Sequence, residues 1–318
     1  MSNKTLKKLS PTTKSPSIAQ KIKQQIGVAR AQRVISFDEL KAIRESVEEA
    51  EQRIQSPGEI SKEGADPVFT LYASVQRAMA MLCNILLQMP ALKPLAKKIL
   101  KAENEYFPSF PPMSPITGAY FAMWTLCDLR APGTSETQAD IFVELADVFG
   151  ISPLMRDCAK LFADSRMGIY QHCGFSGNKI VLRELVTNRE ILFSGSSGYD
   201  GNQGQLWLVR AVAPFNEVIP YWVGMGTPYV LLTPDISEWI SFFARHGICK
   251  DEVGHEARLH QFLKFGPEPR YWSEFIFEGY VNFDPGAVFL RGLPDVPQSR
   301  PHSGSFDPLL NFAKSIGI

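Results

Sequence analysis

The chain has 318 residues, of which 45% are hydrophobic and 21% charged, so it is predicted to be a globular protein of one large or two smaller domains. Its five cysteines lie far apart without a CxxC pair, which argues against a disulfide framework and against a cysteine-rich zinc site. The net charge is zero, but the first 37 residues carry eight basic residues and no acid, which leaves 25 basic against 33 acidic residues in the rest and argues against a broad nucleic-acid footprint on the body.

Residues 1–35 are predicted to be a basic and disordered arm. Residues 1–15 are polar, whereas Ile18, Ile22 and Ile26 form a narrow stripe that is typical of a helix ordered against a partner. We expect the arm to recruit a nucleic-acid or protein partner, because phosphate contacts need clustered Lys and Arg side chains. A transit peptide is the alternative, because the segment contains Ser and Thr but no acid. The basic residues of the arm are Lys4, Lys7, Lys8, Lys14, Lys21, Lys23, Arg30 and Arg33.

The expected location follows from the apolar segments. The N-terminus has no apolar run typical of a secretory signal, and the most apolar segment of the chain, "AMAMLCNILLQM", is too short to span a membrane. We therefore expect a soluble protein in the cytoplasm that contacts no membrane.

Residues 36–165 are predicted to form a helical part. The segment 36–54 begins with a capping box and carries a short a/d seam of apolar residues, so it either packs on the body of the protein or mediates a homo-oligomer. A buried helix is predicted to begin at Pro67, since proline is favoured at the first helical position and the following residues are apolar nearly all round. Further helices are predicted from about 94 to 105, from about 135 to 149, and from residue 153 onward.

Residues 166–318 are predicted to form a β unit with covering helices and an irregular C-terminal tail. The predicted fold class is therefore α+β: a helical N-terminal part, then a small antiparallel β unit, either barrel-like or a curled sheet, covered by C-terminal helices. The glycine-rich segment 195–204 lacks the Lys-Ser or Lys-Thr of a P-loop, so it is predicted to be a hairpin tip, with ligand contact as the alternative. Strands are predicted within 178–186, 190–194, 205–213 and 228–233, and helices within 235–247, 251–266 and 269–281.

Two patterns that could indicate a metal site do not fit. His255, Glu256 and His260 approach the zinc motif HExxH, but the second His comes five residues after the first instead of four, which turns it away by about 100°. Glu274 and Glu278 share a helix face, but a nearby arginine makes an ion-pair ladder the simpler interpretation. No metal and no cofactor is predicted.

An anion site is predicted where the helical part meets the β unit. The stretch "SRMGIYQH" and the tail segment "SRPHS" both combine Ser, Arg and His, and the arginine fork suits phosphate and carboxylate. The two clusters either converge on one anion site or contain buried arginines that tie loops to backbone carbonyls. The candidate ligand-binding residues are Arg166, His172, Arg183, Glu184, Arg300 and His302.

No motif assigns the chain to a known family, and no catalytic residue is predicted. The first hypothesis is a non-catalytic binding or regulatory protein that recruits a nucleic-acid or protein partner through its basic arm. One alternative is an enzyme of unrecognised type that acts on an anionic substrate at the Arg/His cleft. The other alternative is an oligomeric assembly protein that associates through 36–54.

Overall fold

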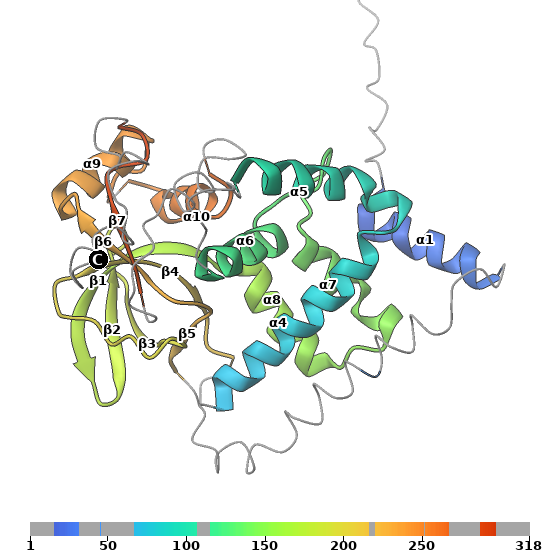
Figure 1. Cartoon of the computed structure of the whole chain (residues 1–318), viewed down its shortest axis with the longest axis horizontal. Coiled ribbons are helices and arrows are strands. Elements are labelled where there is room, and N and C mark those ends of the chain that lie inside the picture. The colour runs from blue at the N-terminus through green and yellow to red at the C-terminus, as the bar shows by residue number, and fades with distance from the viewer. Residues whose placement is uncertain are drawn as a thin grey trace, which may run out of the picture.

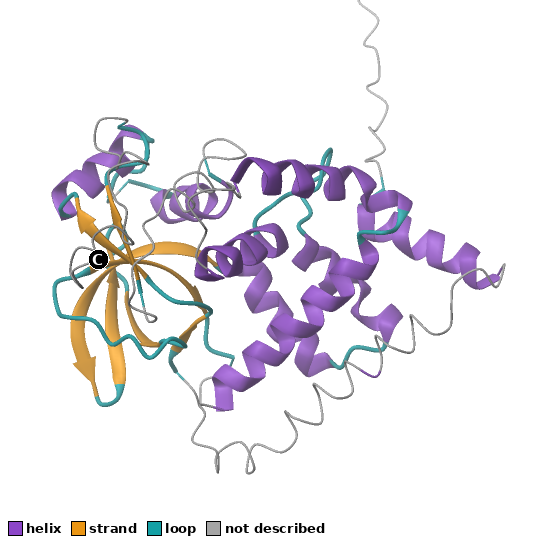
Figure 2. Ribbon diagram, in the orientation of Figure 1, coloured by secondary structure: helices purple, strands orange, loops and turns teal. Residues whose placement is uncertain are grey.

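The computed structural model describes residues 16–31, 45, 67–106, 115–215, 220–250, 252–266 and 287–296. Within them a helical half lies beside a half built around a small barrel, which confirms the predicted α+β fold (Figures 1 and 2). The α-helices are α1 (Ile18–Ala31), α4 (Pro67–Leu86), α5 (Lys93–Tyr106), α6 (Pro115–Cys127), α7 (Gln138–Phe149), α8 (Pro153–Asp164), α9 (Ile236–Arg245) and α10 (His255–Phe265), with a 3-10 turn η2 (Pro90–Leu92) before α5. The strands are β1 (Arg166–Ser176), β2 (Lys179–Glu184), β3 (Glu190–Ser194), β4 (Leu206–Val212), β5 (Trp222–Gly224), β6 (Tyr229–Thr233) and β7 (Val288–Arg291).

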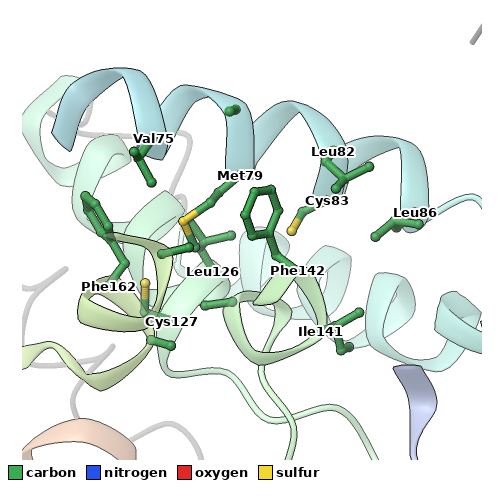
Figure 3. Packing of buried hydrophobic residues seen from close by; sticks show 14 of the residues in the cluster. Val75, Met79, Leu82, Cys83, Leu86, Leu126, Cys127, Ile141, Phe142 and Phe162 are labelled. Atoms are coloured by element: carbon green, nitrogen blue, oxygen red, sulfur yellow. The ribbon is translucent and has the colours of Figure 1, made fainter. Parts of the chain in front are cut away.

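The core of the helical half is built around α4, as its nearly continuous apolar sequence predicts. Met79 of α4 points toward Leu126 of α6, and Phe142 of α7 lies under the same helix, in the packed interior that also includes Leu82 (Figure 3). Each of these side chains is buried, and burying one contributes about 1.5–3 kcal/mol. Among the described helices none is by itself long and apolar enough to cross a membrane, whereas residues 68–86 and 90–104 pass that test as a pair by length and composition alone, with a bend of 99° between them.

The ends of α7 and α8 are set by local side-chain chemistry. Thr137 accepts a hydrogen bond from the Asp140 backbone N–H, and the Asp140 carboxylate accepts one from the Thr137 backbone N–H, which is a capping box. Gly150, at φ 70°, ends α7 in the left-handed region that glycine favours. Ser152 then caps α8, with Pro153 at its first position. These stops and starts are the ones that the sequence predicts, except that α7 begins at Gln138 and not near residue 135.

Helix α1 packs on the helical half through the predicted isoleucine stripe. Ile18, Ile22 and Ile26 are all buried, and the α1 axis lies against α7 and η2. The Glu136 carboxylate accepts hydrogen bonds from the backbone N–H groups of Ile18, at 2.7 Å, and Ala19, at 3.3 Å, so it caps the first turn. Part of the predicted disordered arm is therefore a packed helix whose partner is the chain's own body. The rest of the arm, 1–15 and 32–35, lies outside the described residues, as does the predicted helix 36–54 apart from Glu45.

The β unit is a closed barrel of five strands with two further strands. Strand β1 begins at Arg166, directly after α8, and pairs antiparallel with both β2 and β4, so the order β1-β2-β3-β5-β4 returns to β1. Strands β6 and β7 extend the sheet from β4. Strands β2, β3, β4 and β6 fall within the predicted segments, whereas β1, β5 and β7 were not predicted. The unit is also not wholly antiparallel, because β3 pairs parallel to β5 and β6 parallel to β7.

The alternation of side chains along each strand separates the barrel interior from its outer face. Tyr170, Phe193 and Trp207 point inward and form the apolar barrel core. On the other side of the sheet, apolar residues pack on Trp239 of α9 and Leu259 of α10. The predicted covering of the β unit by helices is therefore present within the described part of the chain.

Candidate functional site

A cavity of about 390 Å³ opens at one end of the barrel, between strand ends and α10. This volume falls within the range of small-molecule sites, and the mouth of a β-barrel is one of the places where such sites occur. The wall combines charged, polar and aromatic side chains from five parts of the chain. The lining residues are Asp164, Ser165, Arg166, Tyr170, Glu184, Thr187, Arg189, Ala211, Trp222, Glu256, Ala257 and His260.

The floor of the cavity holds a buried ion pair. Arg166 is the first residue of β1 and Glu184 the last of β2, and Glu184 lies opposite Tyr170 in the sheet, so all three side chains point to the barrel interior. The Arg166 Nη2 atom lies 2.7 Å from Glu184 Oε1, with the two side chains 11% and 2% exposed. The other carboxylate oxygen, Oε2, accepts a hydrogen bond of 2.7 Å from the Thr187 hydroxyl. The Oε1 atom is closed off from solvent, and its contact with Arg166 is an ion pair without hydrogen-bond geometry.

Tyr170 lies flat along β1 toward this ion pair because Gly168 leaves room for its ring. A Cβ atom at position 168 would lie 2.4 Å from Tyr170 Cε2 and 2.6 Å from the hydroxyl oxygen, so a larger residue there would displace the ring. Burial, followed by the Glu184 charge, raises the pKa of Tyr170 well above its ordinary value, so the phenol stays protonated. No hydrogen-bond partner for this hydroxyl occurs among the described residues, which leaves it free to donate to a molecule in the cavity.

The rim of the cavity carries Arg189 and one face of α10. The Arg189 guanidinium lies over the Trp222 ring, 5.0 Å from its centroid, and is exposed with no carboxylate partner in the described part of the chain. Glu256 and His260 are one helical turn apart on α10 and both line the cavity. Burial lowers the pKa of His260, and the positive charges of Arg166 and Lys264 lower it further, so the imidazole is neutral at pH 7.

A second group of charges is buried behind the cavity wall, between the barrel, α10 and the end of α6. The Asp128 carboxylate pairs with Arg210 through Oδ2 and with Lys264, at 3.4 Å, through Oδ1. The Ser165 carbonyl oxygen accepts hydrogen bonds from Arg210, at 2.9 Å, and from Lys264, at 2.8 Å. All three charged residues are at most 6% exposed, so two buried cations share one buried anion.

The structure brings together only some of the predicted anion-site residues. Arg166 and Glu184 meet at the cavity floor. Arg183 points to the outer face of the barrel, where it is exposed and pairs with Glu190 at 2.6 Å, because neighbouring residues of a strand face opposite sides. Arg300 and His302 lie outside the described residues, so their convergence on Arg166 stays a prediction.

His172 belongs to the opposite end of the barrel. It follows Arg166 by six residues on the same strand, a separation of about 20 Å at the usual rise per residue. Its ring accepts a hydrogen bond at Nδ1 from the Gly174 backbone N–H and donates one from Nε2 to the Asp200 carbonyl oxygen, both at 3.0 Å. The glycine-rich segment 195–204 covers this end, with Gly201, at φ 64°, against the Trp207 ring. His172 therefore holds the covering segment and does not line the cavity.

Sequence reasoning missed most of the cavity residues, among them Tyr170, Arg189, Trp222 and His260. The signal for Tyr170 was its spacing of four residues from Arg166, which puts both on one face of a strand, but β1 was not recognised as a strand. His260 was considered as a metal ligand and as a base partner for a cysteine, but not as part of an anion site. Its ring lines the cavity, whereas the His255 ring contacts the Glu252 carbonyl oxygen at 2.8 Å.

Metal binding and known relatives give no further guide to the site. Among the described residues, no group of three or more His, Cys, Asp or Glu side chains is arranged to hold a metal ion. No protein-family model, no curated protein and no solved structure matches this chain.

Proposed function

We propose that this protein is a binding protein that takes a small polar ligand into the cavity at the mouth of its barrel. The observation that carries the proposal is the buried Arg166–Glu184 pair on the floor of an open cavity, next to a Tyr170 hydroxyl without a partner among the described residues. Replacing a buried ion pair by apolar residues is often neutral or stabilising, so the pair is weak evidence for a role in stability. Recognition of a polar ligand would explain why Arg166, Glu184 and Tyr170 lie on the floor of the cavity.

Binding is favoured over catalysis by the state of the cavity hydroxyls. The Ser165 Oγ atom donates to the Phe162 carbonyl oxygen at 2.7 Å and accepts from Arg210 at 3.0 Å. The Thr187 hydroxyl is held by Glu184. A nucleophilic hydroxyl needs a neighbouring base and free access to the substrate. Neither the Ser165 nor the Thr187 hydroxyl meets these requirements in the structure. The predicted enzyme acting on an anionic substrate is the alternative for the same cavity.

Filling the cavity tests the proposal. Ala257→Trp, on the wall formed by α10, is expected to abolish ligand binding without removing any polar group, because the indole occupies the space of the ligand. The measurement is thermal unfolding with a panel of small anionic, neutral and cationic metabolites. A bound ligand should stabilise the wild-type protein by about 2.7 kcal/mol at roughly 100 times its Kd.

Ala244→Trp is the matched control for this variant. Ala244 is an exposed alanine on α9, outside the cavity, so this variant should respond to the same compounds as the wild-type protein. If every stabilising compound stabilises Ala257→Trp equally, the cavity is not the binding site and the proposal is wrong.

A second candidate function is recruitment of a nucleic-acid partner by the basic arm, and one feature of α5 favours it. Lys93, Lys97 and Lys101 repeat every four residues along this helix and are exposed, and no ion pair engages them within the described residues. Helix α1, which follows residues 1–15 of the arm, lies against η2, the turn that leads into α5 (Figure 1). The four lysines of residues 1–15 precede α1 in the sequence, and together with the α5 lysines they suit a polyanion.

Deleting residues 1–15 tests this function, and the deletion should stop there because the α1 isoleucines belong to the core. The affinity for a single-stranded oligonucleotide is expected to fall about tenfold or more at low salt, and the slope of log K against log salt should decrease by about 3, since four lysines are lost. Fluorescence anisotropy over a salt series measures both. Changing Lys93, Lys97 and Lys101 to Gln tests the α5 row separately. If the deletion variant binds the oligonucleotide with unchanged affinity, the arm makes no electrostatic contact with it.

A further inference from the structure

We propose that the ligand of the barrel-mouth cavity is a small planar molecule carrying an oxyanion, a carboxylate or a phosphate, and that Arg189 is the residue that selects its charge. This inference rests on the proposed function, because it names the class of ligand for the same cavity. It is carried by the hydrogen-bonding groups of the floor, by the buried charges behind the wall, and by the aromatic surface at the rim.

The floor offers hydrogen-bond donors but few acceptors. Neither Glu184 oxygen is open to a ligand: Oε2 accepts a hydrogen bond from Thr187, and Oε1, which lies 2.7 Å from Arg166 Nη2, is closed off from solvent. The Tyr170 hydroxyl is protonated and has no partner among the described residues, and the Arg166 guanidinium has five N–H bonds, of which its contacts to Glu184 and to the Met167 carbonyl oxygen use only some. A carboxylate or phosphate accepts hydrogen bonds and donates none, so it matches this floor better than a cation does.

Within the part of the chain that the structure describes, the buried charges next to the cavity sum to a positive value. The Arg166–Glu184 pair is neutral as a unit, whereas Asp128 balances only one of the two cations Arg210 and Lys264. Asp128, Arg210 and Lys264 are at most 6% exposed, so water and salt screen their charges little. The remaining carboxylates of the wall, Asp164 and Glu256, are exposed at the rim, where water and salt weaken their effect. An anionic group in the interior of the cavity is therefore stabilised by the unbalanced cation.

The rim provides an aromatic surface for a planar group and an exposed positive charge. The Trp222 ring lines the cavity, and the Arg189 guanidinium lies over this ring at 5.0 Å from the centroid. A flat ligand can stack on such an aromatic face, and a guanidinium can bind its oxyanion through two parallel hydrogen bonds. Since no carboxylate holds Arg189 within the described residues, turning toward a ligand breaks no ion pair seen in the structure.

Three nearly isosteric probes test the charge: benzoate, benzamide and benzamidine, which are an anion, a neutral molecule and a cation. Titration followed by NMR chemical shifts should show benzoate binding the wild-type protein about tenfold or more tightly than benzamide, and benzamidine most weakly. Arg189→Gln should remove most of this preference. Glu256→Gln, which removes a negative charge from the rim, should strengthen benzoate binding about threefold. Lys264→Met, which does not touch the cavity, should also weaken benzoate binding relative to benzamide, because it removes the unbalanced cation.

Each outcome separates this inference from the proposed function. If benzoate and benzamide bind equally and Ala257→Trp abolishes both, the cavity binds ligands but not by charge, and the inference is wrong. If Ala257→Trp binds benzoate as tightly as the wild-type protein does, benzoate binds elsewhere and both proposals fall. If none of the probes binds at about 10 mM, or if benzamidine binds best, the assignment of an anionic planar ligand is overturned.

Discussion

Asp128→Asn is expected to lower the free energy of unfolding by about 3–5 kcal/mol, because among the described residues it removes the only anion of the buried charge cluster. In the wild-type protein the Asp128 carboxylate faces Arg210 on one oxygen and Lys264 on the other, and all three residues are at most 6% exposed. The amide has nearly the same shape but no charge. Among the described residues, the two buried cations would then have only neutral acceptors, namely the new amide oxygen and the Ser165 carbonyl and hydroxyl oxygens.

Lys264→Met is the informative comparison. It also removes one charge from the buried cluster, but it leaves the cluster neutral, whereas Asp128→Asn leaves two positive charges. The variant leaves a one-to-one pair of Asp128 and Arg210, and the Ser165 carbonyl keeps its hydrogen bond from Arg210. The change in the free energy of unfolding is therefore expected to stay within about 1 kcal/mol, since methionine fills the space of the lysine stem with little loss of packing. Charge balance thus predicts unequal effects for two residues that are almost equally buried.

Urea unfolding followed by circular dichroism measures both variants, with Asp147→Asn as the control. Asp147 forms an exposed ion pair with Arg156 at 3.2 Å, and removing such a pair should change the midpoint very little. Equal losses in Asp128→Asn and Lys264→Met would contradict the assignment, because they would mean that the packing of the cluster matters and its charge balance does not.

The sequence predicted the helical half well because the signals that set it are local. The stop at Gly150 and the start at Ser152 and Pro153 depend on residues within one turn of each helix end, and both were read correctly. The isoleucine stripe of α1 is also evident from the sequence, but the surface on which it packs is not. Whether Ile22 packs on α7 or on another protein depends on contacts between segments more than 100 residues apart, which periodicity does not encode.

Strand β1 shows why the site was only half predicted. Its sequence, RMGIYQHCGFS, mixes glycines and polar residues. Among its interior positions, Arg166 forms the ion pair, Gly168 leaves room for the Tyr170 ring, and His172 holds the segment 195–204 through Asp200. The apolar alternation that marks a strand is lost for the same reason. The packing of α10 on β1 brings His260 to the Arg166 end of the barrel, and the turn between β2 and β3 places Arg189 there as well, neither of which a local sequence pattern predicts.

His172→Ala is expected to destabilise the protein by about 3 kcal/mol and to leave ligand binding at the barrel mouth unchanged. His172 is fully buried, and its ring satisfies the Gly174 backbone N–H and the Asp200 carbonyl oxygen at 3.0 Å each. Removing the ring leaves both groups without this partner, at about 1–3 kcal/mol for each buried group, and opens a void beside the Trp207 and Phe175 rings that it contacts.

The glycine-rich segment 195–204 should respond most strongly to this change. Its Gly204 backbone N–H donates to the His172 carbonyl oxygen at 2.8 Å, so the backbone bond can persist while the side-chain latch at Asp200 is lost. Amide hydrogen exchange should therefore rise in this segment before the rest of the barrel opens. His255→Ala, which removes a ring held only by an exposed carbonyl contact, is the control and should leave the unfolding midpoint where it is.

The contrast between stability and binding in His172→Ala decides what the two ends of the barrel do. Replacing a residue that contacts the ligand lowers the affinity and can leave the stability unchanged. Replacing a residue that only holds the covering segment lowers the stability and leaves the affinity unchanged. If His172→Ala abolishes benzoate binding while the protein unfolds at the wild-type urea concentration, the ring acts on the ligand, and the assignment of the closed end as purely structural is wrong. If stability falls and benzoate still binds the mouth with the same preference over benzamide, recognition resides in the cavity at the Arg166 end of the barrel.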